Sequence, residues 1–228
     1  MRDLIRIGLP SSIDTFCDML AFALFSSFIG RSGAVALATS QITIQLLSFS
    51  FMPMWGITTA ATVLVGNLIG AGDPARAGRY AREIMVVGIA YTLALAAILA
   101  LAGDRLYGIF TRDAEVLRAG ATMAMLAAVF QAFDGMRMLT LGILQGAGDT
   151  RYPMWVSIGV LYGLFVPLSG WMSIGLHRGV AEIWIAGCVA YALIAAALFQ
   201  RYRAGRWKEI RIFSEPAKTP LRGGAQPV

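Results

Sequence analysis

Charged side chains are scarce in this sequence. Only 14% of the 228 residues are Asp, Glu, Lys or Arg, whereas 57% are hydrophobic, and the mean hydropathy is +0.68. A soluble domain of this length usually carries about 25% charged residues. The shortage of charge therefore argues against a soluble domain and indicates a protein embedded in a lipid bilayer.

Cysteine and histidine are nearly absent, which removes several kinds of chemistry. Cys17 and Cys188 lie in separate apolar runs without metal-ligand spacing, so we expect packing thiols rather than a disulfide or a zinc site. The lone histidine, His177, falls in a predicted outer loop without partners for a nucleophilic triad. The glycine-rich turns at 70–74 and 146–150 follow helices and lack the Gly-Lys-Ser/Thr ending of a phosphate loop. We therefore expect no enzyme.

What the sequence has instead is a series of long apolar runs, which predict an all-α polytopic membrane protein. A six-helix lobe is predicted over 1–212, followed by a disordered basic, Pro/Gly-rich cytoplasmic tail at 213–228. The six predicted spans lie at about 5–29, 33–69, 74–101, 114–144, 151–171 and 180–202.

The distribution of basic residues predicts the orientation. The net charge of +6 comes from residues in loops and at the C-terminus, which is not the pattern of a nucleic-acid-binding patch. Thirteen of the nineteen Lys and Arg residues fall on the side of the two termini and five on the other side. Because basic loops stay in the cytoplasm, we expect both termini to be cytoplasmic, although seven of the thirteen lie from Arg201 onward, at and beyond the end of the last span.

Proline and glycine punctuate the spans. Pro53 and Gly56, in the middle of the second span, predict a kinked or broken helix. The sequence Gly-Ala-Gly-Asp occurs at 70–73 and again at 146–149, where glycine suits a helix end and aspartate a following N-cap. A polar connection is expected at 103–113.

The fourth span carries the most unusual charges. Asp134 and Arg137 lie one helical turn apart, more than ten residues from the turn at 146–150. At about 1.5 Å per residue, this places Asp134 near mid-depth in a bilayer, where ionisable residues are costly and usually functional. The alternative is an ion pair that neutralises itself and only packs helices.

Two further polar stripes lie on apolar helices. Asp14 and Asp18 share one face of the first span. Gln41, Gln45 and Ser48 share a face of the second span, where they would either line a cavity or form interhelical hydrogen bonds.

Taken together, five segments resemble the second half of a multidrug and toxic compound extrusion (MATE) transporter. They are 7–11 (IGLPS), 51–53 (FMP), 65–73 (VGNLIGAGD), 130–134 (FQAFD) and 144–153 (LQGAGDTRYP). Each motif is weak alone, but their order and spacing match over about residues 5–207. The resemblance implies one six-helix lobe of a two-lobe transporter that exports organic, often cationic, compounds in exchange for Na⁺ or H⁺.

The resemblance also implies a site. It places the coupling carboxylates at Asp18 and Asp134, which would also be the ligands of Na⁺; family members commonly carry Glu at the first position. We add Asp14, Gln41, Gln45, Gln131 and Arg137 as candidate ion- or substrate-binding residues, and Arg137 could compete with any cation for Asp134. Aromatic faces for a cationic drug could come from Phe22, Phe25, Phe49, Phe133 and Trp155, but we expect most of these side chains to face lipid or the protein core. No other cofactor is expected.

The length fits only one lobe. The chain would be a fragment of a longer protein, which we favour, or a half-transporter that pairs with a second chain or with another copy of itself. We expect an exporter in the bacterial cytoplasmic membrane. A non-transporting or degenerate membrane subunit, or a lipid-linked or sugar carrier of the wider superfamily, are the alternatives.

Overall fold

The chain folds into a bundle of long helices. The computed structural model describes residues 2–175 and 179–209, and the predicted tail at 213–228 and His177 lie outside these ranges. The described residues are helical apart from short connections, and six helical rods are long and apolar enough to cross a membrane, so the all-α membrane fold is confirmed. The elements are α1 (Arg2–Gly30), α2 (Ala34–Gly70), α3 (Pro74–Phe110), α4 (Ala114–Gly146), α5 (Arg151–Val160), η1 (Leu161–Phe165), α6 (Val166–Gly170), η2 (Trp171–Gly175), α7 (Val180–Arg203) and η3 (Arg206–Glu209).

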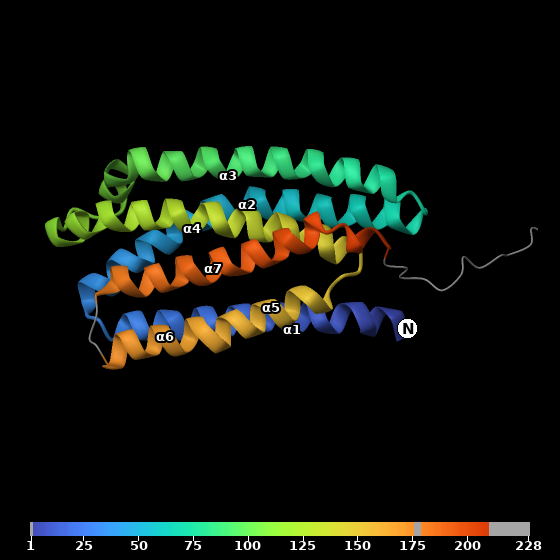
Figure 1. Cartoon of the computed structure of the whole chain (residues 1–228). Helices are drawn as coiled ribbons and strands as arrows, with labels where there is room; N and C mark the ends of the chain where they lie inside the picture. The colour runs from blue at the N-terminus through green and yellow to red at the C-terminus, as the bar shows by residue number, and fades with distance from the viewer. Residues whose placement is uncertain (1, 176–178, 210–228) are drawn as a thin grey trace, which may run out of the picture.

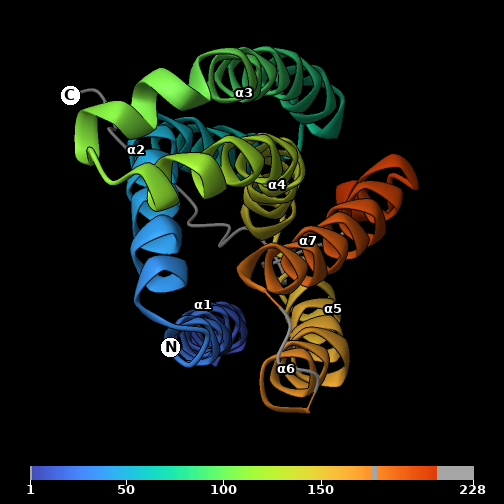
Figure 2. The same ribbon diagram turned by 90° about the vertical axis from the view of Figure 1, so that its left-hand side faces the viewer.

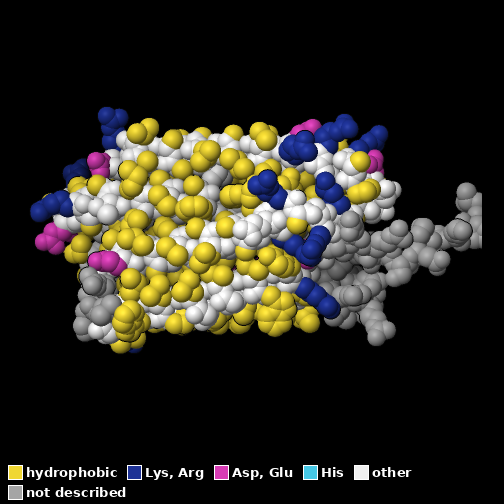
Figure 3. Space-filling model, viewed as in Figure 1, with side chains coloured by type: hydrophobic (Ala, Val, Ile, Leu, Met, Phe, Trp, Pro, Cys, Tyr) yellow, Lys and Arg dark blue, Asp and Glu magenta, His cyan; other side chains and the backbone are white. Residues whose placement is uncertain are grey.

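The helices lie side by side along one direction (Figure 1). Viewed from the end, α4 lies in the middle of the bundle and contacts α2, α3 and α7 most extensively (Figure 2). α1 lies on one side together with α5 and α6, its main neighbours. Apolar side chains cover the middle of the visible surface and basic side chains gather toward its two ends, as a bilayer-embedded protein requires (Figure 3).

Small residues bring α4 close to its neighbours. A Cβ atom at Gly142 would lie 2.8 Å from the backbone oxygen of Thr58 on α2, and one at Gly135 would collide with Thr92 on α3. The Thr62 hydroxyl donates a 3.0 Å hydrogen bond across the interface to the Gly142 carbonyl. In a membrane, where water does not drive helices together, such close packing and hydrogen bonding hold a bundle in place.

The two Gly-Ala-Gly-Asp turns share a backbone but not the role of their aspartates. Gly72 and Gly148 adopt φ values of 77° and 83°, and each following Asp N–H donates back to a carbonyl five residues earlier. Asp73 then caps α3 by accepting from the Arg76 N–H at 2.9 Å, as predicted. The expected capping role is wrong for Asp149, whose carboxylate instead binds Arg201 Nε of α7 at 2.8 Å.

Two predicted boundaries differ from the structure, and of the kinked and broken alternatives for α2 the break is absent. α3 continues to Phe110, through most of the polar connection predicted at 103–113, because Tyr107 is buried against Gly120 of α4 and hydrogen-bonds to Thr43 of α2. α2 is not broken at Pro53 but remains one helix, whose direction changes along its length in Figure 1. The fifth rod continues to Gly175 and contains a π turn, η1, just before Pro167. A proline cannot donate and crowds the preceding turn, so this wider turn accommodates it.

We expect Gly142→Ala to destabilise the protein by about 1–3 kcal/mol, because the added methyl group meets the Thr58 backbone rather than a movable side-chain end. The measurement is thermal unfolding in detergent. Gly159→Ala is the matched control: a Cβ there has no neighbour within 4 Å, so the variant should gain up to about 1 kcal/mol of helix propensity. Equal melting temperatures for the two variants would contradict the close contact.

Candidate functional site

Arg137 lies at the centre of a cluster of ionic and aromatic groups from three helices. Its Nε donates to Asp134 Oδ1 at 2.8 Å, and its Nη2 lies 3.5 Å from Asp18 Oδ2 on α1. The Tyr191 hydroxyl of α7 donates to Asp18 Oδ1 at 3.1 Å, and the guanidinium lies over the Tyr191 ring, 4.9 Å from its centroid. We call Asp18, Asp134, Arg137 and Tyr191 the ion cluster. The structure thus brings Asp18 and Asp134 to one place, joined by Arg137.

The cluster is largely withdrawn from the surface. Asp134 is 1% exposed and Arg137 8%, whereas the Asp18 side chain is 31% exposed. Ions at such depth persist only when they are paired and hydrogen-bonded. Two carboxylates share one guanidinium, which leaves a formal charge of −1. The self-neutralising pair considered from the sequence is therefore present, but it does not neutralise the whole cluster.

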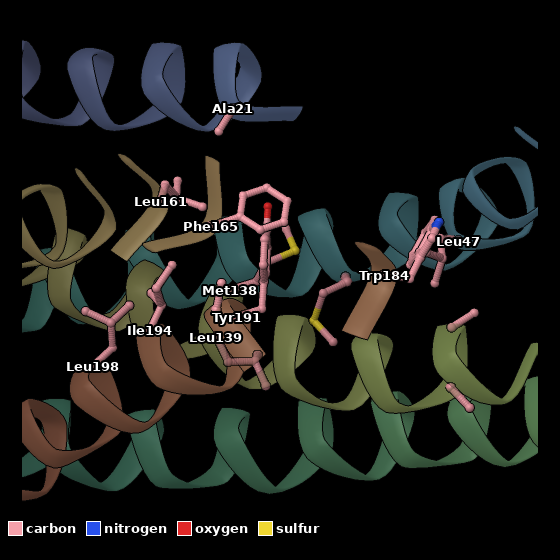
Figure 4. Packing of buried hydrophobic residues seen from close by; sticks show 14 of the residues in the cluster. Ala21, Leu47, Met138, Leu139, Leu161, Phe165, Trp184, Tyr191, Ile194 and Leu198 are labelled. Carbon is pink, nitrogen blue, oxygen red and sulfur yellow. The ribbon is translucent and has the colours of Figure 1, made fainter. Parts of the chain in front are cut away.

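The ion cluster opens into a cavity of about 370 Å³. Most of its wall is apolar and aromatic, and Met19 and Trp55, both largely exposed, lie among its lining residues. Met138, Phe165 and Trp184 belong both to this wall and to the buried packing shown in Figure 4. The lining residues are Asp18, Met19, Phe22, Phe25, Ile44, Leu47, Ser48, Phe51, Trp55, Phe130, Asp134, Arg137, Met138, Phe165, Trp184, Gly187 and Tyr191. An apolar cavity of a few hundred Å³ with a few converging polar groups is typical of a small-molecule site.

The remaining polar candidates do not line this cavity. Asp14 is buried at 4% exposure beside Ser157 of α5, one turn from Asp18, and its Oδ1 has no hydrogen-bond partner among the described residues. Gln131 is also buried. Gln41 and Gln45 are exposed on the outside of this lobe, so the interpretation of that stripe as a cavity wall applies only to Ser48.

Some of the aromatic candidates line the cavity and others do not. Phe22 and Phe25 line the cavity, whereas Phe49, Phe133 and Trp155 are exposed and do not. Sequence reasoning missed Tyr191 and Trp184, although a tyrosine hydroxyl or indole N–H inside an apolar helix calls for a partner. Trp184 Nε1 finds one in Ser40 of α2 at 3.1 Å.

The cluster fits a metal ion poorly. Hard cations are held by about six oxygen ligands, several of them carboxylate or carbonyl oxygens. Among the described residues, no group of three or more Asp, Glu, His or Cys side chains is placed to hold a metal. Both oxygens of Asp18 and one oxygen of Asp134 already accept hydrogen bonds, and only Asp134 Oδ2 lacks a partner within the described part of the chain. The Na⁺ site expected at Asp18 and Asp134 therefore does not match this donor set.

Six membrane-crossing rods around a buried ionic cluster and an aromatic cavity define a class, the helical lobe of a membrane transporter. The MatE family model matches residues 10–171, and the chain belongs to the MATE family.

Relatives and solved structures agree with this assignment. NorM of Xanthomonas campestris pv. campestris, described as a probable multidrug resistance protein, is 34% identical over 201 residues, covering 88% of this chain and 43% of that protein. The multidrug resistance protein NorM of Burkholderia vietnamiensis is 31% identical over 89% of this chain and 45% of its own length. The chain thus spans about half the length of the relatives it matches.

The fold itself matches known MATE structures. An outward-facing multidrug resistance MATE transporter superposes with a TM-score of 0.81 at 17% identity, covering 90% of this chain and 45% of that one. The eukaryotic MATE transporter AtDTX14 also gives 0.81, at 21% identity over 92% of this chain and 47% of its own.

We expect Arg137→Met to destabilise the protein by about 3–5 kcal/mol, because it leaves the Asp134 carboxylate buried without a counter-charge. The double variant Arg137→Met/Asp134→Leu should recover most of this loss. Thermal unfolding in detergent measures both. Arg76→Met, which breaks the exposed Asp73–Arg76 pair, is the control and should cost less than about 1 kcal/mol. A double variant no more stable than Arg137→Met alone would show that the pair is not what holds this region.

Proposed function

We propose that this chain is one lobe of a cation-coupled exporter of organic, cationic compounds, with the ion cluster as its coupling site and the adjoining cavity as part of its substrate path. The observation that carries this proposal is the contact between the two: Asp18, Asp134 and Arg137 all line an aromatic cavity. The relatives named as multidrug resistance proteins support transport out of the cell and a wide range of transported compounds.

The cavity suits a lipophilic cation. Its wall supplies aromatic faces, including Phe22, Phe130 and Trp184, which attract a cation electrostatically and an apolar body by contact. The formal charge of −1 on the ion cluster adds a longer-ranged attraction. A neutral or anionic compound would gain less from the same groups.

The coupling step follows from how α1 is held. α1 packs mainly on α5 and α6, and among the described residues its side-chain hydrogen bonds to α4 and α7 are made by Asp18, to Arg137 and Tyr191. Neutralising the cluster, or engaging Asp18 with a bound organic cation, would weaken this tie between α1 and the rest of the lobe. A coupling ion acts by favouring one of two conformations of the protein, and a weaker contact between α1 and the rest of the lobe would favour one of them.

A complete transporter would need a second lobe. Coverage of about 45% of each relative supports a second six-helix unit, supplied by the rest of a longer protein, by a partner chain or by another copy. In this assembly the exposed Gln41 and Gln45 would be available to the opposite lobe. We place both termini on the cytoplasmic side of a bacterial cytoplasmic membrane, in line with the excess of basic residues there.

A binding experiment tests the proposal on the chain itself. Tetraphenylphosphonium added to the purified protein in nanodiscs should quench tryptophan fluorescence, because Trp55 and Trp184 line the cavity. Asp18→Asn should weaken this binding about tenfold, since one negative charge is lost beside the bound cation. Glu83→Gln, the same change at an exposed carboxylate on α3, is the control and should leave binding unchanged.

Absence of tetraphenylphosphonium binding by the wild-type chain would favour a non-transporting subunit. Equal binding by wild type and Asp18→Asn would remove the ion cluster from the substrate path. For the assembled two-lobe protein, export that is not inhibited by cationic dyes would favour a lipid-linked or sugar carrier.

A further inference from the structure

The position between Asp18 and Asp134 is already taken by a positive charge of the protein. The Arg137 guanidinium binds Asp134 through Nε at 2.8 Å and approaches Asp18 through Nη2 at 3.5 Å. It is held there from a third direction by the Tyr191 ring, 4.9 Å away. A guanidinium is always charged, and its donors form a fixed planar fork, so it occupies this position permanently rather than as a titrating group.

Arg137 and Tyr191 engage most of the carboxylate oxygens of the ion cluster. Three of the four carboxylate oxygens accept hydrogen bonds from Arg137 or Tyr191, which leaves Asp134 Oδ2. α2 and η1 line the cavity with Ile44, Leu47, Ser48, Phe51, Trp55 and Phe165, which include no carboxylate. Asp14, one turn before Asp18 on α1, does not line the cavity. A metal ion bound to Asp134 Oδ2, or to a remaining lone pair of the other three oxygens, would lie beside a guanidinium that repels it.

We propose that Arg137 is the residue that determines cation selectivity in this site: its guanidinium stands in place of a metal ion between Asp18 and Asp134 and excludes Na⁺. The consequence for transport rests on the proposed function. Of the two candidate coupling ions, Na⁺ and H⁺, a lobe with this cluster is left with H⁺, because Na⁺ has no coordination site.

The test is sodium binding, which needs no transport activity. Radioactive sodium is titrated onto the purified full chain in nanodiscs in a scintillation proximity assay. The wild type should show no saturable binding. Arg137→Gln removes the guanidinium while adding an amide oxygen, and saturable sodium binding should appear, at least about tenfold above the wild-type signal.

Two variants control for charge and for folding. Arg118→Gln makes the same change at an exposed arginine on the same helix and should leave sodium binding absent. Arg137→Lys keeps a positive charge in the cluster and should also bind no sodium. Each variant is first checked for a single peak in size-exclusion chromatography, so that an unfolded protein is not scored.

The wild-type measurement keeps the inference falsifiable even if Arg137→Gln does not fold. Saturable sodium binding by the wild type that is lost in Asp134→Asn would overturn it, as would a folded Arg137→Gln that binds no sodium. Failure of tetraphenylphosphonium to bind would overturn the proposed function instead, because the sodium measurement does not depend on an organic substrate.

Discussion

The structure depends on the ion pairs and hydrogen bonds of one buried guanidinium, that of Arg137. Arg137 lies deep among apolar helices, where an unpaired ion costs several kcal/mol and an ion with good partners is tolerated. Its partners come from α1, α4 and α7, so the same contacts that stabilise the charge also define where these helices stand relative to one another. The cluster contains two carboxylates and one guanidinium, which leaves it with a formal charge of −1.

The position of Arg137 depends in turn on α4. Glycines at the α2 and α3 interfaces let α4 pack so closely that a methyl group would collide at several of them. This close packing places Arg137 beside α1 and α7, where it meets Asp18 and Tyr191. α1, by contrast, is packed mainly on α5 and α6, and its side-chain hydrogen bonds to α4 and α7 among the described residues are made by Asp18. The site therefore joins α4, which is packed closely on α2 and α3, to α1, which packs mainly on α5 and α6.

The cavity shows why membership of a transporter family does not by itself identify the coupling ion. Carboxylates at corresponding positions can serve as metal ligands only when enough oxygens remain free, and the neighbouring residues determine this. Here the residue one turn after Asp134 is an arginine, and the hydroxyl of Tyr191 occupies a further carboxylate oxygen. The chemistry of the site is thus determined as much by these two neighbours as by the acids themselves.

What the sequence alone determined was local. Long apolar runs predicted six membrane-crossing helices, because a span must satisfy its backbone within itself. The one-turn spacing of Asp134 and Arg137 gave an ion pair as one of two alternatives, and the structure contains that pair. Glycine in the Gly-Ala-Gly-Asp turns likewise predicted the backbone at Gly72 and Gly148.

The tertiary structure alone decided every contact between distant helices. Asp18 and Arg137 are 119 residues apart, Tyr191 lies further still, and the two similar aspartates Asp73 and Asp149 take different partners because only one has Arg201 nearby. The same holds for Gln41 and Gln45, which share a helical face with Ser48 but not its place at the cavity. The period of a helix shows which residues share a face, but only the packing of the whole bundle shows what that face meets.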